Sequence, residues 1–239
     1  MSVRKRPAVR LALASFRQLR KPDRWERVKT LGRVWTSMGE SDAIPQRFPP
    51  DVWPGIEAIT AQVRLNRASW ALRPAEQVVL DAVVRFTAPR IIFEFGTATG
   101  HGAVLLADAA PEGATVHTVD VPDEYVPAIG PLRPDMIGRE FASRPEYENR
   151  IVQHRIDLAR FDVDPYRSAV DLLFVDDGHT YQDVIRDSRL ALEMVAPGGC
   201  IIWDDYAPPH HGAIRALNEL STQTPLVRIR GTRLVAHLG

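Results

Sequence analysis

The sequence predicts an α/β protein built on a mostly parallel sheet with helices on both of its faces. Two observations carry this prediction. From residue 74 onward, short apolar runs alternate with amphipathic stretches of helical period, and a glycine-rich loop follows the first apolar run. Strands that alternate with helices are typical of parallel sheets, in which each strand is buried on both faces.

The first element of this region is expected to be a helix. Pro74 suits a first helical position, Glu76 suits the positive end of the helix dipole, and Pro89 ends the segment. The apolar residues of this segment fall on one helical face, so we expect that face to be buried. They are Val78, Val79, Ala82, Val83 and Phe86.

Seven short apolar segments bounded by Gly, Pro or acidic residues are expected to be strands. They are 91–95, 115–120, 151–157, 171–177, 200–205, 225–230 and 233–238. Helices are expected among them at 103–110, 181–195 and 211–222. A Gly-Thr turn joins the last two strands, so one C-terminal strand should run antiparallel to the rest.

Two regions are expected along the chain. Residues 1–70 are rich in Arg and Trp and contain four prolines between positions 45 and 54, which predicts an N-terminal helical extension or lid. Residues 71–239 would form the α/β domain, and a chain of this size buries an ample core.

Charge is unevenly spread, although the formal net charge of the chain is zero. Residues 1–30 hold ten Lys or Arg and two acidic residues, whereas the remainder is acidic. A basic arm can bind nucleic acid or anionic lipid. We expect instead an amphipathic helix that packs on the acidic domain or on a second copy of the chain.

Composition excludes several classes of protein. No apolar run approaches the ~18 residues needed to cross a bilayer, and the basic N-terminal segment lacks a clear signal-peptide cleavage site. Cys200 is the only cysteine, which rules out an internal disulfide and fits a reducing cytosol. We therefore expect a cytoplasmic protein in which Cys200 is an inert residue of a buried strand.

A glycine loop follows the first predicted strand. Gly96, Gly100 and Gly102 give the spacing G-x-x-x-G-x-G, and Glu94 precedes them. Glycines let the backbone turn sharply near a ligand, and the helix start that follows offers N–H groups to a carboxylate or phosphate. Asp120 ends the next strand, where an acid can bind both hydroxyls of a ribose. The spacing differs from the G-x-G-x-x-G loop of dinucleotide-binding proteins, which argues against a nicotinamide cofactor.

The loop E-x-G-x-x-x-G resembles motif I of class I S-adenosylmethionine-dependent methyltransferases. A second stretch, 171–206, reads DLLFVDDGHTYQDVIRDSRLALEMVAPGGCIIWDDY. Its VDDGHTY and WDDY segments resemble the methyltransferase domain 24 family, which includes small-molecule and sugar O-methyltransferases, and the similarity extends over about 74–238. The resemblance implies a Rossmann-like class I methyltransferase fold with a seven-stranded, mostly parallel sheet and an antiparallel C-terminal strand.

The resemblance also implies where S-adenosylmethionine would bind. Contacts are expected from the glycine loop, from the acid after the second strand, from an acid on the adenine side and from an acid beside the methionine end. These residues are Glu94, Gly96, Thr97, Gly100, Asp120, Asp157 and Asp176. Asp157 has an alternative interpretation as the cap of the turn that follows it.

Four aspartates cluster where the fourth and fifth predicted strands end: Asp176, Asp177, Asp204 and Asp205. Carboxylates this close repel one another unless a cation neutralises them. Relatives that methylate vicinal hydroxyls imply a Mg²⁺ site at Asp176, Asp204 and Asp205, where the ion would lower the pKa of a bound hydroxyl. The alternative is that Asp176 contacts the cofactor while the other two acids cap the next segment.

Three histidines follow these strands. His179 and Asp176 are the candidate catalytic residues, with His179 as a general base whose pKa lies near neutrality. His179 can instead form a hydrogen bond that fixes the Asp176 loop. His210 and His211 are expected to be solvated, the alternative being a role as base or ligand.

The expected function is methyl transfer from S-adenosylmethionine to a hydroxyl oxygen of a small molecule or sugar, with or without Mg²⁺. The expected partners are that acceptor and a second copy of the chain; neither a membrane span nor a nucleic-acid partner is expected. Three alternatives stay open. They are a nucleic-acid methyltransferase or binder that uses the basic arm, a nicotinamide-dependent oxidoreductase, and a catalytically inactive binding module.

Overall fold

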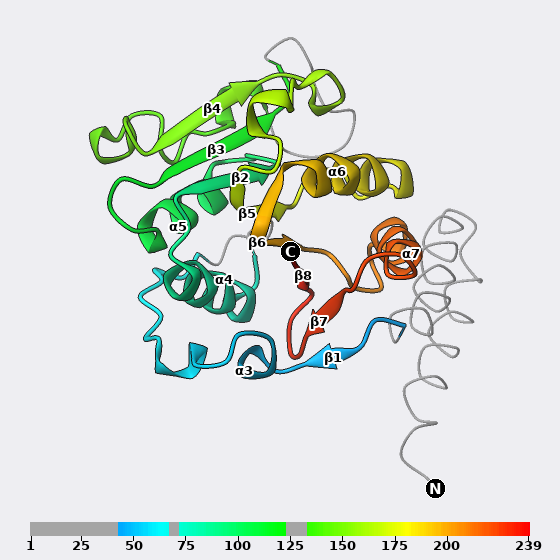
Figure 1. The fold of residues 1–239 in the computed structure, drawn as a ribbon. Coiled ribbons are helices and arrows are strands. Elements are labelled where there is room, and N and C mark those ends of the chain that lie inside the picture. Colours follow the sequence, from blue (N-terminus) through cyan, green and yellow to red (C-terminus); the bar gives the residue numbers. More distant parts are fainter. Residues whose placement is uncertain (1–42, 67–71, 123–132) are drawn as a thin grey trace, which may run out of the picture.

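The computed structural model describes residues 43–66, 72–122 and 133–239, and their core is one eight-stranded sheet (Figure 1). The strand order is β1-β7-β8-β6-β5-β2-β3-β4. Neighbouring strands are parallel except for β8, which is antiparallel to both β6 and β7. The predicted α/β fold with an antiparallel C-terminal strand is confirmed, and β1 is a strand that the sequence does not predict.

The described elements follow the predicted order. The strands are β1 Gln46–Arg47, β2 Ile91–Phe95, β3 Thr115–Asp120, β4 Ile151–Arg155, β5 Val170–Val175, β6 Val195–Trp203, β7 Val227–Ile229 and β8 Val235–Leu238. The α-helices are α3 Pro49–Val52, α4 Pro74–Thr87, α5 His101–Ala109, α6 Tyr181–Met194 and α7 His211–Leu220. Short 3₁₀ turns lie at η2 Ile56–Ala58, η3 Pro134–Met136, η4 Pro145–Tyr147, η5 Leu158–Arg160 and η6 Asp164–Tyr166.

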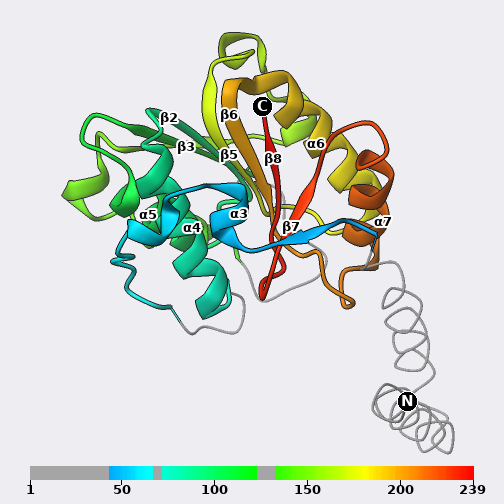
Figure 2. The same ribbon diagram turned by 60° about the horizontal axis from the view of Figure 1, so that its bottom comes forward.

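The described part of the N-terminal region departs from the predicted helical extension. β1 pairs in parallel with β7, and the backbone N–H groups of Arg228 and Arg230 donate to the carbonyls of Pro45 and Arg47 at 2.9 and 2.8 Å. Figure 2 shows β1 beside β7, with α3 continuing from it. The closely spaced prolines limit helix length, and the edge of β7 gains backbone partners. The basic arm and its amphipathic stripe lie outside the described residues.

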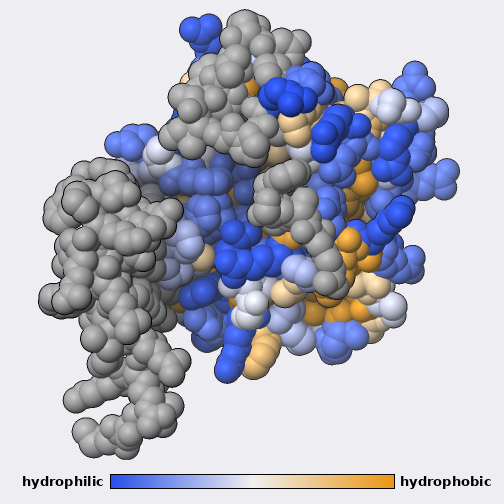
Figure 3. All heavy atoms as spheres, turned by 180° about the vertical axis from the view of Figure 1, so that it is seen from behind, coloured by the Kyte–Doolittle hydropathy of each residue, from blue (hydrophilic) through white to orange (hydrophobic). Residues whose placement is uncertain are grey.

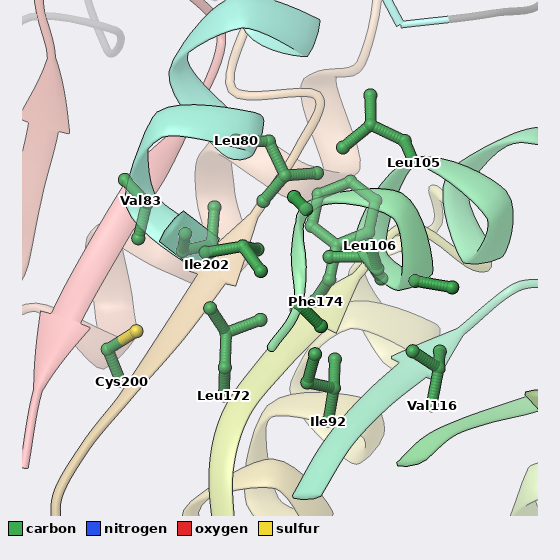
Figure 4. Close-up of a cluster of buried hydrophobic side chains, with 14 of the residues drawn as sticks. Leu80, Val83, Ile92, Leu105, Leu106, Val116, Leu172, Phe174, Cys200 and Ile202 are labelled. Carbon is green, nitrogen blue, oxygen red and sulfur yellow. The ribbon is translucent and has the colours of Figure 1, made fainter. Parts of the chain in front are cut away.

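Side chains along the strands alternate between the two faces of the sheet. On one face, Ile92 and Leu172 pack against α4 and α5 (Figure 4). On the other face, Phe93 and Leu173 belong to a second buried cluster, which also includes residues of α6 and α7. Cys200 belongs to the first cluster, and burial raises the pKa of its thiol to about 12. This is the inert core position that the sequence predicts.

The buried face of helix α4 matches the predicted one in part, since Val83 is fully buried and Val79 and Ala82 pack partly buried against the core. Leu80 and Val84 are fully buried, but Val78 and Phe86 are 40% and 36% exposed. Glu76 is also fully buried, although it is charged. Apolar periodicity misses part of this face because a buried polar side chain with a partner occupies one of its positions.

Within the described part of the chain, no helix combines the length and apolar character needed to cross a membrane. Seen from behind, hydrophilic side chains cover much of the described surface, and hydrophobic side chains form patches between them (Figure 3).

Strand order reverses between β2 and β5. The chain proceeds from β2 to β3 and β4 on one side, and from β5 to β6 on the other. In open α/β sheets, the carboxyl ends of the strands at such a point form the usual ligand crevice. The glycine loop and the predicted aspartates all follow carboxyl ends of these strands, so the fold brings them to one edge.

Candidate functional site

The loop after β2 depends on glycine for close packing. Gly96 and Gly100 have φ of +94° and +92°, in the left-handed region that favours glycine. A Cβ on Gly96 would lie 2.2 Å from the carbonyl oxygen of Asp176, and one on Gly100 would lie 2.7 Å from the ring of Phe141. The predicted spacing therefore lets the loop pack against the end of β5 and against the segment near residue 141.

Asp120 ties the end of β3 to this loop. Its Oδ2 accepts the N–H of Ala98 at 2.7 Å, and its Oδ1 accepts the N–H of Val121 at 2.7 Å. Burial raises the pKa of Asp120, although these hydrogen bonds oppose the shift. Carboxylate oxygens can accept more than one hydrogen bond each, so the group keeps capacity for ribose hydroxyls.

Glu94 and Thr97 support the loop from within the protein. The Oε2 atom of Glu94 accepts the hydroxyl of Thr118 at 2.6 Å, and the hydroxyls of Thr97 and Thr118 lie 2.6 Å apart. A Cβ on Gly102 would lie 2.0 Å from Oε1 of Glu94, so this third glycine leaves room for the acid. Burial raises the pKa of Glu94 to about 8. A direct contact of these two residues with a cofactor stays a prediction.

Asp157 is the cap of a turn. It lies at the N-terminal end of η5, exposed, and its Oδ1 accepts the N–H of Ala159 at 2.9 Å. The capping interpretation is confirmed. The adenine-side contact stays a prediction.

The segment after η3 covers the glycine loop. The N–H of Gly138 donates to the carbonyl of Ala98 at 2.9 Å, and the N–H of Glu140 donates to the carbonyl of Thr99 at 3.0 Å. The Thr99 hydroxyl also donates to Glu140 Oε1 at 3.0 Å. The segment around Gly138 and Glu140 is therefore bound to the loop in which the sequence predicts cofactor contacts.

The acids at the end of β6 have a partner that the sequence analysis missed. Arg233 Nη2 donates to Asp204 Oδ2 at 2.8 Å, and Nη1 donates to Asp205 Oδ1 at 2.6 Å. Its Nε and Nη2 atoms donate to the two oxygens of Glu76, in the first turn of α4, at 2.9 and 3.0 Å. The predicted C-terminal hairpin is the signal that would have located Arg233, because an antiparallel strand begins at the edge where its parallel neighbour ends.

One guanidinium does not neutralise all of these acids. Burial, together with the charges of Asp204 and Asp205, raises the pKa of Asp176 well above its ordinary value. Burial and the charge of Asp205 raise the pKa of Asp204 to about 7, although Arg233 opposes the shift. The Oδ1 atom of Asp204 is buried and has no hydrogen-bond partner. At this edge of the sheet, the acids after β5 and β6 therefore outnumber the cationic side chains that contact them.

The three acids of the predicted Mg²⁺ site do not come together as a close ligand set. Among the described residues, the group that brings one potential ligand atom each within 4.8 Å of the others is His179, Asp205 and His210. Arg233 already binds two of the acids, so a magnesium ion between them would require Arg233 to move. The three acids that do not come together in this way are Asp176, Asp204 and Asp205.

His179 and His210 face the same carboxylate. Nε2 of His179 lies 3.2 Å from Asp205 Oδ2, and Nε2 of His210 lies 3.2 Å from Asp205 Oδ1. The two rings meet edge to face, with centroids 4.7 Å apart. Burial lowers the pKa of His210, which Asp205 partly opposes. His210 is therefore part of the site, and the expectation that it is solvated is wrong.

Backbone geometry places Asp205 between the two rings. Its φ is +65°, which is uncommon for a residue with a side chain. The side chain of Asp205 is 9% exposed and that of His210 is 23% exposed, whereas that of His179 is 51% exposed. The cluster therefore has a buried acid at its base and one imidazole open to solvent.

Comparison with known proteins supports the family resemblance of the sequence motifs. A family model described as a methyltransferase domain matches residues 93–206, from β2 through the glycine loop to the aspartates after β6. Over these residues the chain is similar to a methyltransferase domain. The model is that of methyltransferase domain 24, the family that the sequence motifs resemble, and the match covers just under half of the chain.

Solved structures of methyltransferases share the fold of this chain. An O-methyltransferase from Bacillus cereus in complex with SAH (S-adenosylhomocysteine) superposes with a TM-score of 0.55 and 17% identity, over 79% of this chain and 99% of that one. The O-methyltransferase TomG from Streptomyces achromogenes, involved in tomaymycin synthesis and in complex with SAM (S-adenosylmethionine), gives 0.54 and 15%, over 84% and 94%. An SAH-bound methyltransferase from Podospora anserina gives 0.54 and 16%, over 82% and 87%. At these identities the likeness is one of fold.

A curated relative covers a smaller part of the chain. An uncharacterized protein of Acanthamoeba polyphaga mimivirus is 40% identical over 57 residues, which is 23% of this chain and 26% of that protein. The chain thus matches about a quarter of the length of this relative, and the match adds no activity to the methyltransferase domain.

Proposed function

We propose that the methyltransferase domain transfers a methyl group from S-adenosylmethionine to a hydroxyl oxygen of a small molecule or sugar. Solved structures of the same fold include O-methyltransferases in complex with SAH and SAM. When bound, S-adenosylmethionine would supply a methyl group on a positively charged sulfur. An edge with unbalanced carboxylates is chemically suited to a ligand that carries a sulfonium and an ammonium group.

The residues that would hold the cofactor lie on both sides of the β2–β5 crevice. Asp120 would accept hydrogen bonds from the ribose hydroxyls, and Gly96 and Gly100 keep the loop close to the ends of the strands. Asp176 would lie beside the methionine end, where its carboxylate would be stabilised by positive charge. Asp157 would face the adenine from the end of β4.

The contact between His179 and Asp205 carries the proposal for the chemical step. Oδ2 of Asp205 lies 3.2 Å from Nε2 of His179, so this nitrogen would carry the proton of the neutral ring and Nδ1 would carry its lone pair; the side chain is half-exposed. The acceptor oxygen would bond to the methyl carbon as the carbon–sulfur bond breaks, with that electron pair going to sulfur. The hydroxyl proton would pass to Nδ1 of His179, and Asp205 would stabilise the resulting imidazolium.

Magnesium on Asp176, Asp204 and Asp205 is the other route that the family resemblance implies. Because Arg233 donates to two of these acids, we expect added Mg²⁺ to leave the rate unchanged. A rate that rises with Mg²⁺ and is lost in Asp204→Asn would favour that route over His179 as the base.

Methyl transfer from radiolabelled cofactor to a panel of hydroxylated metabolites and sugars tests the function. The His179→Ala variant should lose about 100-fold or more in kcat, the usual contribution of a general base. His237→Ala is the matched control, since His237 lies on β8 and its Nδ1 contacts the carbonyl of Pro225. Unchanged turnover in His179→Ala, or label transferred only to amines, would reject the proposal.

The alternatives have separate readouts. A nicotinamide oxidoreductase would bind NAD more tightly than SAH in calorimetric titrations. A nucleic-acid enzyme would show affinity for DNA or RNA that falls steeply with salt and is lost when residues 1–30 are removed. That arm lies outside the described residues, so the nucleic-acid alternative rests on charge alone.

A further inference from the structure

We propose that His179, Asp205 and His210 form a binding site for one divalent transition-metal ion of the zinc class. The ligands differ from the acid-only magnesium site that the family resemblance implies, and they share only Asp205 with it. Two imidazoles and one carboxylate come from two loops, one after β5 and one between β6 and α7.

The distances suit a single ion. Each imidazole Nε2 lies 3.2 Å from a different oxygen of Asp205, and one ligand atom from each of the three residues lies within 4.8 Å of the others. Ligands held at about 2.1 Å in a tetrahedron are separated by roughly 3.4 Å. Each histidine–aspartate distance is close to such an edge, although the two end on different oxygens of Asp205, so an ion held by one carboxylate oxygen would draw the ligand atoms together from within 4.8 Å.

The ligand atoms select the class of ion. Imidazole nitrogen suits zinc, iron, nickel and copper, whereas Mg²⁺ prefers an all-oxygen octahedral shell. Two histidines out of three ligands therefore favour a borderline transition ion over Mg²⁺. Arg233 donates to Asp205 and would act on the ion through it, by fixing the orientation of the carboxylate.

The surroundings favour a cation. Glu76, Asp176 and Asp204 adjoin the cluster, so with Asp205 four acids surround the guanidinium of Arg233, while the charge of Arg73 acts on His210. The buried Oδ1 of Asp204 has no hydrogen-bond partner, which is a second sign of missing positive charge. A dication on the neighbouring histidines would offset this excess.

The solvent-exposed side of the cluster would let a bound ion contact the acceptor and take part in methyl transfer. This step alone rests on the proposed function. The His179 side chain is 51% exposed, so coordination positions beyond the three ligands face solvent and an incoming acceptor. A hydroxyl bound there would have a lowered pKa and would release its proton to water, while the ion occupies Nε2 of His179. The cation would then replace His179 as the agent of deprotonation.

Metal titration of the full chain, without cofactor or acceptor, tests the site. Calorimetry with Zn²⁺ and with Mg²⁺ should show one Zn²⁺ site that binds at least tenfold more tightly than Mg²⁺. The His210→Ala variant should lose tenfold or more in Zn²⁺ affinity, whereas its neighbour control His211→Ala should bind as the wild type does. The visible absorption of bound Co²⁺ should report nitrogen ligands in the wild type and should change in His210→Ala.

Thermal unfolding separates loss of the site from loss of the fold. Zn²⁺ should raise the Tm of the wild type and of His211→Ala by several degrees and leave that of a folded His210→Ala unchanged. Equal affinity in His210→Ala and the wild type would overturn the proposal. So would tighter binding of Mg²⁺ than of Zn²⁺, or the absence of a saturable site. Because methyl transfer is not measured, failure of the proposed function leaves these outcomes intact.

Discussion

The guanidinium of Arg233 donates to Asp205 Oδ1 at 2.6 Å, and through this contact a residue that precedes the last strand holds the acid between the two histidines. The same guanidinium binds Asp204 and Glu76, so it links the end of β6 to the first turn of α4. Arg233 thus joins the C-terminal hairpin to the site.

Replacing Arg233 should cost stability. Burial opposes ionisation of Glu76, but hydrogen bonds from Arg233 and the backbone of Arg73 bring its pKa below the ordinary value, so the pair is charged in the fold. Arg233→Met leaves buried carboxylates without their cation and should lower the free energy of unfolding by about 3 to 5 kcal/mol. Urea denaturation measures this change.

Two further variants control that experiment. Arg233→Lys keeps the charge but not the planar fork that serves three acids, so its loss should be intermediate. Arg133→Met removes an arginine from a surface ion pair with Asp135, both largely exposed, and should change stability little. Equal stability of Arg233→Met and Arg133→Met would show that the ion-pair network is not formed.

The site shows which functional residues can be predicted from the sequence and which cannot. The glycine loop and Asp120 could be predicted because each lies next to a strand end, and parallel strands end at one edge. Arg233 could not be placed from its own neighbours, because its partners are 28 and 157 positions away in the chain. The role of Glu76 is hidden for the same reason, since the sequence shows only an acid in a first helical turn.

The histidines show a second limit of predicting the site from the sequence. Adjacent histidines in a loop are usually solvated, so neither His210 nor His211 stands out in the sequence. The positive φ of Asp205 and the start of α7 at His211 decide that His210 contacts the acid. The buried face of α4 is predicted only in part for a related reason, because apolar periodicity takes no account of Arg233, the partner that lets Glu76 be buried.

Gly96→Ala should disrupt the glycine loop. The new Cβ would lie 2.2 Å from the carbonyl oxygen of Asp176 at a φ of +94°, so the ends of β2 and β5 must separate. We expect a loss of about 3 kcal/mol or more in the free energy of unfolding. Gly113→Ala is a matched control with a φ of +80° and no atom within 4 Å, and should lose only about 1 kcal/mol. Similar losses in both would mean that backbone strain, and not the collision, sets the cost at Gly96.

Asp120→Asn should weaken cofactor binding. The amide keeps the shape of the side chain, but its nitrogen cannot accept the N–H of Ala98 or a ribose hydroxyl. Titration of SAH should show a loss of roughly 10- to 100-fold in affinity, the range of about 1.5 to 3 kcal/mol for hydrogen bonds to a charged group. Asp162→Asn, which alters an acid that accepts the N–H of Asp164, should bind as the wild type does. Undiminished affinity in Asp120→Asn would remove Asp120 from the cofactor site.

Glu94 should make stability depend on pH. Burial raises its pKa from 4.5 to about 8, so the folded protein holds a proton that the unfolded chain releases. The stabilisation from this proton is complete below pH 4.5 and is lost as the pH rises through about 8. The total loss in the free energy of unfolding is about 1.4 kcal/mol for each pH unit that separates the two pKa values. Glu94→Gln cannot ionise, so its stability relative to the wild type should improve between about pH 5 and about pH 9. Urea unfolding of both proteins across that range measures the difference and cancels the other titrating groups. A constant difference would mean that Glu94 is already ionised in the folded protein near neutral pH, and that the Thr118 hydroxyl donates to a carboxylate charge beneath the glycine loop.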